Sequence, residues 1–461
     1  MDRLAAWSRS WLNLVAVVGF LVVAIWFLGP YLVNRPSRGA VTVSVNPSLP
    51  SISAHYAPSV LAKWQGSEQT AFSGVLSGFQ QQHSIAVNYQ SSGDLLPQVL
   101  GSRVASGSTP DIAILPQPGL LRDLARQHRL VPLDGVVDPR AWSDAAPLWR
   151  QLATVDHRTY GVYFKVANKS MIWYRPSAFQ RAGIAGPPGS YAELLEDTAR
   201  LRQAGIAPFA LCGASGWTLS DWFENVYLQT AGAERYDRLA QLDGVSWNDP
   251  TVASALDALN RAFGGGDNVL GGLQRAAATP YPDCVSEVFG PPEPRAAMVF
   301  EGDFVQGEIR SLYPSLQPGR DYAFFAFPGP GGGGPQPVVV GGDVAVMLRD
   351  TPQARELMSY LGTPQAADVW VRLGGFISPN RRVPLSSYPN ELTRNAASAI
   401  VSRRSQLVFG MSDLAPAGFG STVDGGEWAD LQAWLVSPGD VAGAQARLER
   451  DAEAAYQVVR G

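Results

Sequence analysis

The chain has 461 residues, of which 46% are hydrophobic and 16% are charged. It is too long for one ordinary hydrophobic core, so we expect two lobes, and its composition excludes a disordered protein. The formal net charge is −4, with 36 Lys and Arg against 40 Asp and Glu, which leaves no basic field for holding nucleic acid or acidic lipid.

The first expected element is an apolar segment at residues 11–33, which follows Arg9. About 20 apolar residues are enough to cross a bilayer as a helix. We therefore expect residues 1–56 to be an N-terminal transmembrane helix that anchors the chain, followed by a tether. The alternative is a cleaved signal peptide, for which Arg3 and Arg9 would supply the positive charge. In either case the bulk of the chain is expected to be extracellular or periplasmic.

After the tether, the sequence alternates between helical and strand patterns. Ser67 is placed to cap a helix whose apolar residues between Phe72 and Phe79 recur at helical spacing. The elements expected next are, in order, a strand at 85–89, a helix at 95–104, a buried strand at 111–115 and a helix at 119–127. This alternation is typical of a parallel-rich α/β sheet.

Three later helix starts are marked by capping residues. Ser190 with Glu193 forms a capping-box pattern, while Thr351-Pro352 and Thr363-Pro364 each place a cap before a proline at the first helical position. Residues 338–348 are expected to form a strand that contains Gly341 and Gly342. Because glycine within a strand indicates the close approach of another group, we expect a ligand to approach there.

The sequence contains no pattern that indicates catalysis or a bound metal. Its four histidines stand far apart, and no G-x-S-x-G nucleophile motif occurs. We therefore predict a protein that is not an enzyme, with no catalytic residue, no metal and no cofactor. A pair of carboxylates for glycoside cleavage stays an alternative, because only their separation in space identifies such a pair.

Cys212 and Cys284 are the two cysteines of the sequence. An even number in an exported chain favours one disulfide, and the alternative is two buried thiols. If joined, they close a loop of about 72 residues, a constraint worth roughly 4 kcal/mol in the chain-entropy model.

Ten segments carry a family resemblance that runs from about residue 60 to the C-terminus. They are Trp64–Phe72 (WQGSEQTAF), Ser91–Leu96 (SSGDLL), Gly107–Gly119 with Leu130–Asp134, Tyr160–Tyr163, Asn168–Tyr174 (NKSMIWY), Gly216–Asn225 (GWTLSDWFEN), Met298–Phe304 (MVFEGDF), Val340–Asp343 (VGGD) and Gly374–Asn380 (GGFISPN). In this order they resemble the extracellular solute-binding proteins (family 1) of carbohydrate ABC importers, closest to the alpha-glucoside-binding branch.

The resemblance implies a two-lobe α/β fold of the periplasmic-binding-protein type (type II), with a hinge and an interlobe cleft. Residues 57–167 with 315–362 would form the first lobe, and residues 168–314 with 363–461 the second. It further implies a monomer that captures a mono- or oligosaccharide, such as an alpha-glucoside, and delivers it to permease subunits served by a separate ATPase. This chain departs from the family in having no lipid-anchoring Cys near its N-terminal apolar run.

The resemblance also indicates which side chains would hold the solute. The expected ligand contacts are Glu68, Ser92, Asp94, Gln117, Asn168, Trp217, Asp221, Trp222, Asp303, Phe304, Gly342, Asp343 and Phe376. The polar residues among them can hydrogen-bond hydroxyl groups, and the aromatic rings can pack against sugar faces. For each there is a plainer alternative: helix capping or solvation for the polar residues, and core packing for the rings.

Three other classes of function compete with this hypothesis. A binding protein for a peptide or a polyamine would share the fold, and a polyamine would require an acidic cleft. A surface glycoside hydrolase would need two carboxylates at a suitable separation. A sensor ectodomain would need a signalling module, for which the residues before 12 leave no room.

Overall fold

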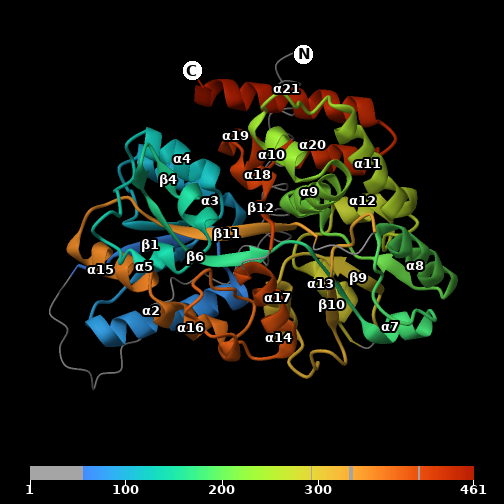
Figure 1. Cartoon of the computed structure of the whole chain (residues 1–461), viewed down its shortest axis with the longest axis horizontal. Coiled ribbons are helices and arrows are strands. Elements are labelled where there is room, and N and C mark those ends of the chain that lie inside the picture. Colours follow the sequence, from blue (N-terminus) through green and yellow to red (C-terminus); the bar gives the residue numbers. More distant parts are fainter. Residues whose placement is uncertain (1–55, 292, 332–335, 403–404, 461) are drawn as a thin grey trace, which may run out of the picture. The chain divides into compact units, whose positions relative to one another are not determined.

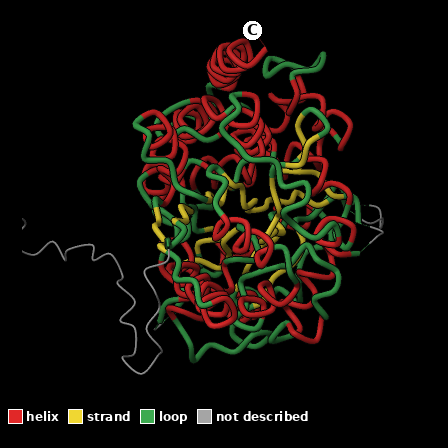
Figure 2. The backbone as a smooth tube through the Cα atoms, turned by 90° about the vertical axis from the view of Figure 1, so that its left-hand side faces the viewer, coloured by secondary structure: helices red, strands yellow, loops and turns green. Residues whose placement is uncertain are grey.

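The computed structural model describes residues 56–291, 293–331, 336–402 and 405–460, which belong to one compact unit. The predicted membrane anchor and the alternative signal peptide lie outside these residues. Within the described part, none of the helices combines the length and the apolar character needed to cross a membrane. The chain contains two larger β-sheets and many helices, and Figure 2 shows the strands in the middle with helices around them.

The first sheet has six strands, in the order β12-β11-β3-β1-β2, with β6 also paired to β11. Its strands are β1 (Ser59–Ala62), β2 (Asn88–Ser91), β3 (Ile112–Leu115), β6 (Gly161–Asn168), β11 (Val338–Met347) and β12 (Leu407–Phe409). The pairs β1/β2, β1/β3 and β11/β12 are parallel, whereas β11 is antiparallel to both β3 and β6. Parallel pairs need crossover connections, and the helices supply them.

The second sheet has four strands, in the order β10-β7-β9-β8. They are β7 (Met171–Tyr174), β8 (Ala207–Phe209), β9 (Ala296–Phe300) and β10 (Ala323–Ala326), and a separate two-stranded ribbon joins β4 (Thr154–Val155) to β5 (Arg158–Thr159). We call each larger sheet, with the helices that pack on it, the first and the second lobe. Figure 1 shows β6 and β11 side by side, running toward the second lobe.

The helices cover both sheets (Figure 1). They are α2 (Gly66–His83), α3 (Leu96–Ala105), α4 (Pro118–Arg126), α5 (Arg140–Ser143), α6 (Pro147–Leu152), α7 (Pro176–Arg181), α8 (Tyr191–Gln203), α9 (Trp217–Ala231), α10 (Ala233–Gln241), α11 (Pro250–Phe263), α12 (Gly272–Ala277), α13 (Asp283–Phe289), α14 (Val305–Leu312), α15 (Pro352–Leu361), α16 (Pro364–Val371), α17 (Glu391–Val401), α18 (Met411–Leu414), α19 (Ala417–Gly420), α20 (Gly426–Leu435) and α21 (Val441–Arg460).

Most of the predicted helix starts are confirmed, and one is wrong. The hydroxyl groups of Thr351 and Thr363 accept hydrogen bonds from the first turns of α15 and α16, and Ser190 accepts one from the Glu193 N–H. Ser67 does not cap α2, because the helix already begins at Gly66, and the Ser67 hydroxyl donates to Glu308 Oε1 at 3.0 Å instead.

The chain crosses between the sheets three times. It passes from β6 to β7 through Lys169 and Ser170, returns between β10 and β11, and leaves β12 to enter α18, which packs on the second lobe's helix α10. The first two crossings are joined by hydrogen bonds from Lys169 N to Val339 O (2.9 Å) and from Val339 N to Ser170 Oγ (2.9 Å). The strand ends of both sheets therefore meet near Lys169.

The predicted division of the chain between the lobes stays a prediction as a whole, but several segments lie with the other lobe from the one we expected. Strand β12 pairs with β11 of the first sheet, and helix α17 packs on β6. Strand β10 pairs with β7 of the second sheet. Helix α16 packs on α2, where the rings of Trp370 and Trp64 lie 4.9 Å apart. A capping pattern locates the start of a helix but carries no information about which sheet that helix covers.

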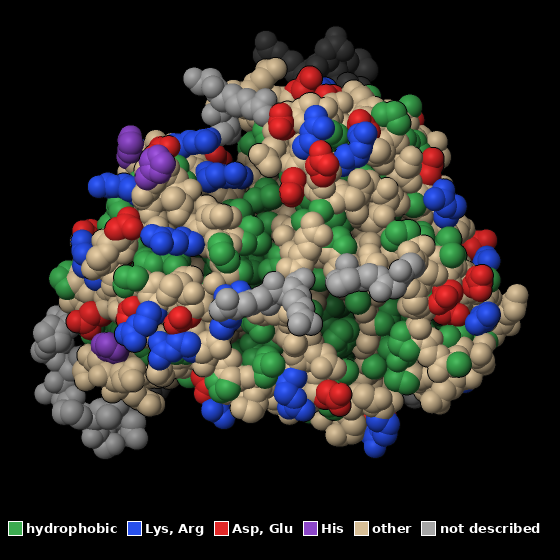
Figure 3. All heavy atoms as spheres, viewed as in Figure 1, with side chains coloured by type: hydrophobic (Ala, Val, Ile, Leu, Met, Phe, Trp, Pro, Cys, Tyr) green, Lys and Arg blue, Asp and Glu red, His purple; other side chains and the backbone are tan. Residues whose placement is uncertain are grey.

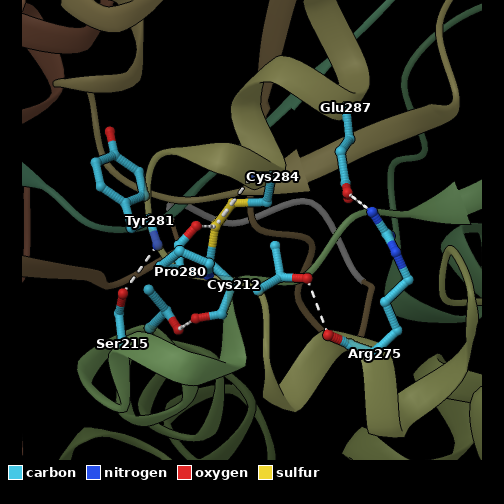
Figure 4. The surroundings of a disulfide bond; sticks show 9 residues. Cys212, Ser215, Arg275, Pro280, Tyr281, Cys284 and Glu287 are labelled. Atoms are coloured by element: carbon cyan, nitrogen blue, oxygen red, sulfur yellow. Dashed lines mark hydrogen bonds and ion pairs between the residues drawn. A yellow bond between two sulfur atoms is a disulfide. The ribbon is translucent and has the colours of Figure 1, made fainter. Parts of the chain in front are cut away.

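The predicted disulfide between Cys212 and Cys284 is confirmed. Figure 4 shows that it joins the segment after β8 to α13, beside Pro280 and Tyr281. The backbone N–H of Tyr281 donates to the Ser215 hydroxyl at 2.9 Å, and Arg275 forms an ion pair with Glu287 on α13. The bridge thus fixes the loop that carries Tyr281.

Candidate functional site

The two lobes touch through side chains at the carboxyl ends of the first sheet's strands. Lys63 follows β1, and its Nζ lies 5.9 Å from the ring centroid of Trp217, the first residue of α9 in the second lobe. The Trp217 side chain also hydrogen-bonds Asp94, which follows β2. Burial raises the pKa of Asp94, and the nearby Lys63 ammonium and the Trp217 hydrogen bond oppose that shift.

Three aromatic rings surround this contact on the side of the second lobe. The ring of Trp217 lies 5.3 Å from Tyr281 and 6.0 Å from Phe304, and Tyr281 and Phe304 are 5.8 Å apart, all in edge-on arrangements. Lys165 from β6 places its Nζ 5.6 Å from the Phe304 centroid. This cluster offers apolar ring surface beside charged groups, a combination typical of small-molecule sites.

Lys165 is the centre of an ion-pair network within the first lobe. It pairs with Glu68 on α2 and has Asp343 and Asp303 nearby. Burial lowers the pKa of Lys165, but the attraction of these carboxylates outweighs it, so the pKa is raised. Asp343 is also held by the Trp64 indole, whose Nε1 donates to Asp343 Oδ2 at 3.3 Å.

A second network surrounds Lys169 at the crossing between the sheets. Its Nζ lies 3.0 Å from Asp221 Oδ1 on α9 and 2.8 Å from Asp413 Oδ2 on α18. Glu224, one turn after Asp221, accepts hydrogen bonds from Ser412 N (2.8 Å) and from the Tyr236 hydroxyl (3.0 Å). Burial raises the pKa of Glu224 to about 7, although Lys169 counteracts the shift.

Several buried polar atoms beside these networks have no hydrogen-bond partner among the described residues. They include both carboxyl oxygens of Glu301, Asp221 Oδ2, the Tyr281 hydroxyl and Trp428 Nε1. Trp428 packs on Gly216, the residue before Trp217, where an added Cβ would lie 2.7 Å from Trp428 Cβ. Unpaired buried polar atoms are costly, which points to a solute that would hydrogen-bond them.

We call the following residues the interlobe layer: Lys63, Glu68, Asp94 and Lys165 from the first lobe, and Trp217, Asp221, Tyr281, Glu301, Phe304 and Trp428 from the second. On the face shown in Figure 3, hydrophobic side chains gather toward the centre and charged ones toward the rim. Lys165 and Asp221 differ from these charged residues at the rim because they are buried, with exposures of 3% and 1%. No three or more His, Cys, Asp or Glu residues of the described part are arranged to hold a metal ion.

Many of the predicted contacts lie where the two sheets approach each other, and they form two groups. Glu68, Asp94, Trp217, Asp221 and Phe304 belong to the interlobe layer. Asn168, Asp303 and Asp343 lie at the crossing or beside Lys165, where Asn168 N donates to Asp303 Oδ1 at 2.8 Å and the Asn168 side chain accepts from Ser170 N at 3.0 Å.

Ser92 and Gln117 also follow strands of the first sheet, as expected. The Ser92 hydroxyl donates to Ala62 O at 3.4 Å. Gln117 occupies the N-cap position of α4 without capping it, and its Oε1 is buried with no partner in the described part. Their role as ligand contacts stays a prediction.

Three other predicted contacts are closely packed against the protein itself, and their role as ligand contacts stays a prediction. Trp222 packs in the second core against Phe209, Phe263, Phe300 and Phe327, and Phe376 packs in the first core against Phe164 and Trp370. At Gly342 the approaching group is the protein itself, because an added Cβ would lie 2.8 Å from the Tyr163 ring. Gly341 likewise faces Lys169 Cε, and β11 runs through both glycines with a bulge only after Asp343.

Sequence reasoning did not select Lys63, Lys169, Tyr281, Glu301 or Trp428. Glu301 and Lys169 lie inside segments that carry the family resemblance, so their sequence position was a usable signal. Tyr281 could have been suspected from its closeness to Cys284 in the chain. Trp428 and Lys63 have no distinguishing pattern around them, since a single tryptophan or lysine is usually part of a core or a solvated surface.

Comparison with known proteins gives a consistent result. Residues 63–368 match the family model described as "Bacterial extracellular solute-binding protein". The chain is 32% identical over 367 residues to "Osmoprotective compounds-binding protein GgtB" of Synechocystis sp., covering 78% of this chain and 85% of that one. It is 30% identical over 389 residues to "Alpha-glucosides-binding periplasmic protein AglE" of Rhizobium meliloti, with coverages of 78% and 80%.

Solved structures show the same fold at low sequence identity. The bacterial solute receptor AcbH, described as exclusively preferring β-D-galactopyranose, superposes with a TM-score of 0.72 at 18% identity and covers 86% of this chain and 98% of its own. A chitin oligosaccharide binding protein gives a TM-score of 0.72 at 17% identity, with coverages of 87% and 99%. The two-lobe α/β arrangement is therefore that of solute-binding proteins.

Proposed function

This chain belongs to the bacterial extracellular solute-binding proteins, and on that premise we propose that it captures a sugar outside the cell and delivers it to an ABC permease. The observation that carries the proposal is the interlobe layer. It brings the Trp217, Tyr281 and Phe304 rings together with buried, unpaired polar atoms of Glu301, Tyr281 and Trp428.

A sugar suits the chemistry of this layer. Its C–H faces pack on aromatic rings, and its hydroxyl groups both donate and accept hydrogen bonds. Carboxylates such as Glu68 and Asp94 accept from hydroxyl groups, while the Trp428 indole N–H donates to them. We propose that the solute is an alpha-glucoside, which is supported by the name of the relative AglE, an alpha-glucosides-binding protein.

Delivery requires that occupancy change the shape of the protein. In the described part the lobes are joined by three crossings, and lobes joined in this way close around a ligand by hinge rotation. We propose that the permease recognises the closed form of the protein. We also propose that the apolar run at residues 11–33 keeps the chain at the membrane in place of a lipid anchor, with the sugar-binding part extracellular.

Thermal unfolding of the full chain against trehalose, sucrose, maltose, raffinose, galactose and spermidine tests the function. The full chain includes the apolar run at residues 11–33 and is therefore kept in detergent. This detergent should have no sugar headgroup, because such a headgroup is itself a candidate ligand. A ligand that binds only the folded state stabilises it by about 2.7 kcal/mol at 100 times its Kd, which raises Tm by a few degrees. We expect such a rise with at least one glucoside, recovered chemically intact.

The variant Trp217→Ala should abolish the rise, because it removes the ring between Lys63 and Tyr281. Tyr160→Ala is the matched control, a half-buried aromatic residue next to β6 and away from the layer. A rise with spermidine alone, or cleavage of the sugar during the measurement, would contradict the proposal.

A further inference from the structure

Glu301 occupies an unusual position for a carboxyl group. It follows β9, its N–H bonds to Met171 O at 3.2 Å, and it is 1% exposed. Neither of its carboxyl oxygens accepts a hydrogen bond from an N–H or O–H group of the described residues. The charged group that acts on it most strongly is a second carboxyl group, that of Asp221.

The charged and titratable groups around this pair come from every element packed against it. They are Asp221 and Glu224 on α9, Lys169 at the crossing, Asp413 on α18, Glu427 on α20, Lys63 after β1 and Tyr281 in the disulfide loop. Carboxylates outnumber the two lysines. Lys169 is engaged by Asp221 Oδ1 and Asp413, and Asp221 Oδ2 has no hydrogen-bond partner in the described part.

Two ionised carboxylates cannot remain in contact at a buried site without a cation between them. One proton between them resolves the conflict. Because Lys169 stabilises the charge of Asp221, the proton resides on Glu301, whose O–H then donates to Asp221. Burial, followed by the charge of Asp221, accordingly raises the pKa of Glu301 well above its usual range.

We propose that Glu301 contacts the solute as a neutral carboxyl group, and that the part of the solute facing it is therefore an uncharged hydroxyl group rather than an ammonium group. The Glu301 hydroxyl donates to Asp221, and its carbonyl oxygen accepts a hydrogen bond from the solute. Tyr281, whose pKa burial raises, belongs to the same lobe and lies near Glu301. This inference rests on the proposed function and specifies the solute's chemistry at one position.

The test is the affinity of the full chain for trehalose, sucrose or maltose, whichever gives the largest thermal shift, measured between pH 6 and pH 9. Glu301→Gln retains the carbonyl oxygen and a donor toward Asp221, so at pH 6 its Kd should stay within about threefold of wild type. Glu301→Ala leaves the solute hydroxyl unpaired and should weaken binding by about fivefold to a hundredfold. Glu287→Gln is the matched control, a buried glutamate of the same lobe held by Arg275 (Figure 4).

The pH profile separates a neutral Glu301 from an ionised one. A group that must be protonated for binding leaves the wild-type Kd unchanged below its pKa and raises it by up to about tenfold per pH unit above that pKa. Any divergence between the wild-type and Glu301→Gln profiles should therefore be a weakening of wild-type binding as the pH rises. The inference is overturned if Glu301→Gln loses binding as severely as Glu301→Ala at pH 6, if wild-type binding tightens with rising pH while that of Glu301→Gln does not, or if glucosamine binds more tightly than glucose through its ammonium group.

A measurement on the wild type alone covers the case in which the variants do not fold. Calorimetric titration in buffers of different ionisation enthalpy reports proton exchange on binding, and at pH 6, where Glu301 is already protonated before the solute binds, we expect none. Sugar binding with proton release would mean that the carboxyl group ionises on binding, which would overturn the inference and leave the proposed function intact. Failure of every sugar to bind would instead contradict the proposed function.

Discussion

Lys169 is the cation on which two buried carboxylates depend. It lies at the crossing between β6 and β7, with its side chain 13% exposed, and it pairs with Asp221 and Asp413 from two different helices of the second lobe. Burial lowers the pKa of Lys169, but these two carboxylates raise it well above its ordinary value. With a folded pKa above the unfolded one, the lysine stabilises the fold below its unfolded pKa, and this stability is lost only as the pH rises through the folded pKa.

Replacing Lys169 with Met should therefore destabilise the protein strongly. The change leaves Asp221 and Asp413 buried without their counter-charge, which costs about 3 to 5 kcal/mol when one partner of a buried pair is removed. The free energy of unfolding at pH 7 from denaturant titration measures the effect. As a control, Arg181→Met removes the exposed ion pair with Glu293 and should change the free energy of unfolding by about 1 kcal/mol at most. Equal losses of stability in the two variants would show that burial does not make the Lys169 ion pairs more stabilising than an exposed pair.

The residue scale is also where sequence reasoning was weakest. Trp217 and Trp222 lie five positions apart in one short motif, yet one ring lies in the interlobe layer and the other in the second core. Both are compatible with stacking on a sugar, and only the direction of α9 decides between them. Glu301 was missed for a similar reason. What distinguishes it is the nearby carboxyl group of Asp221, which is distant in the chain, and a single sequence does not reveal such a neighbour.

Elements were more predictable than residues because their signals are local. The helical spacing of Phe72 to Phe79 and the Thr351 and Thr363 caps locate α2, α15 and α16. The resemblance to a known family supplied the two lobes. The pairing of β10 with β7 and the packing of α16 on α2 depend on contacts between distant parts of the chain, so no local pattern could indicate them.

The start of α4 illustrates how tightly an element of the first lobe meets the third crossing. An added Cβ at Gly119 would lie 2.0 Å from Ala415 O, in the segment that follows α18. The helix and this backbone are therefore in direct contact, and only glycine fits between them. Gly101 in α3 is the natural comparison, because an added Cβ there has no heavy atom within 4 Å.

Gly119→Ala should accordingly destabilise the protein by about 1 to 3 kcal/mol, since the backbone has to move to admit the methyl group. Gly101→Ala should instead stabilise it by roughly 0.5 to 1 kcal/mol, because alanine favours a helix and space is available. Both free energies come from denaturant unfolding of the full chain. Equal effects of the same sign at the two positions would contradict the close contact at Gly119.

At the scale of the whole molecule, the three crossings lie next to one another. Lys169 N bonds to Val339 O at 2.9 Å, Gly410 N bonds to Val340 O at 2.9 Å, and the Ser170 hydroxyl reaches Asn225 Oδ1 at 2.6 Å. Adjacent crossings let one lobe rotate against the other with little change inside either. The contacts of Lys63 and Asp94 with Trp217 would then be made and broken by that rotation.

If the sugar is held in the interlobe layer, its binding should shift this equilibrium toward the closed form and lower the radius of gyration of the protein in solution. Small-angle X-ray scattering of the full chain, with and without a saturating sugar identified by thermal unfolding, measures the change after identical subtraction of the detergent. A sugar that gives no thermal shift is the control and should leave the radius unchanged. A ligand moves a conformational equilibrium only by its differential affinity for the two states. Tight binding with an unchanged radius of gyration would therefore mean that the sugar does not favour the closed form. In that case the permease would have to recognise a feature of the protein other than closure.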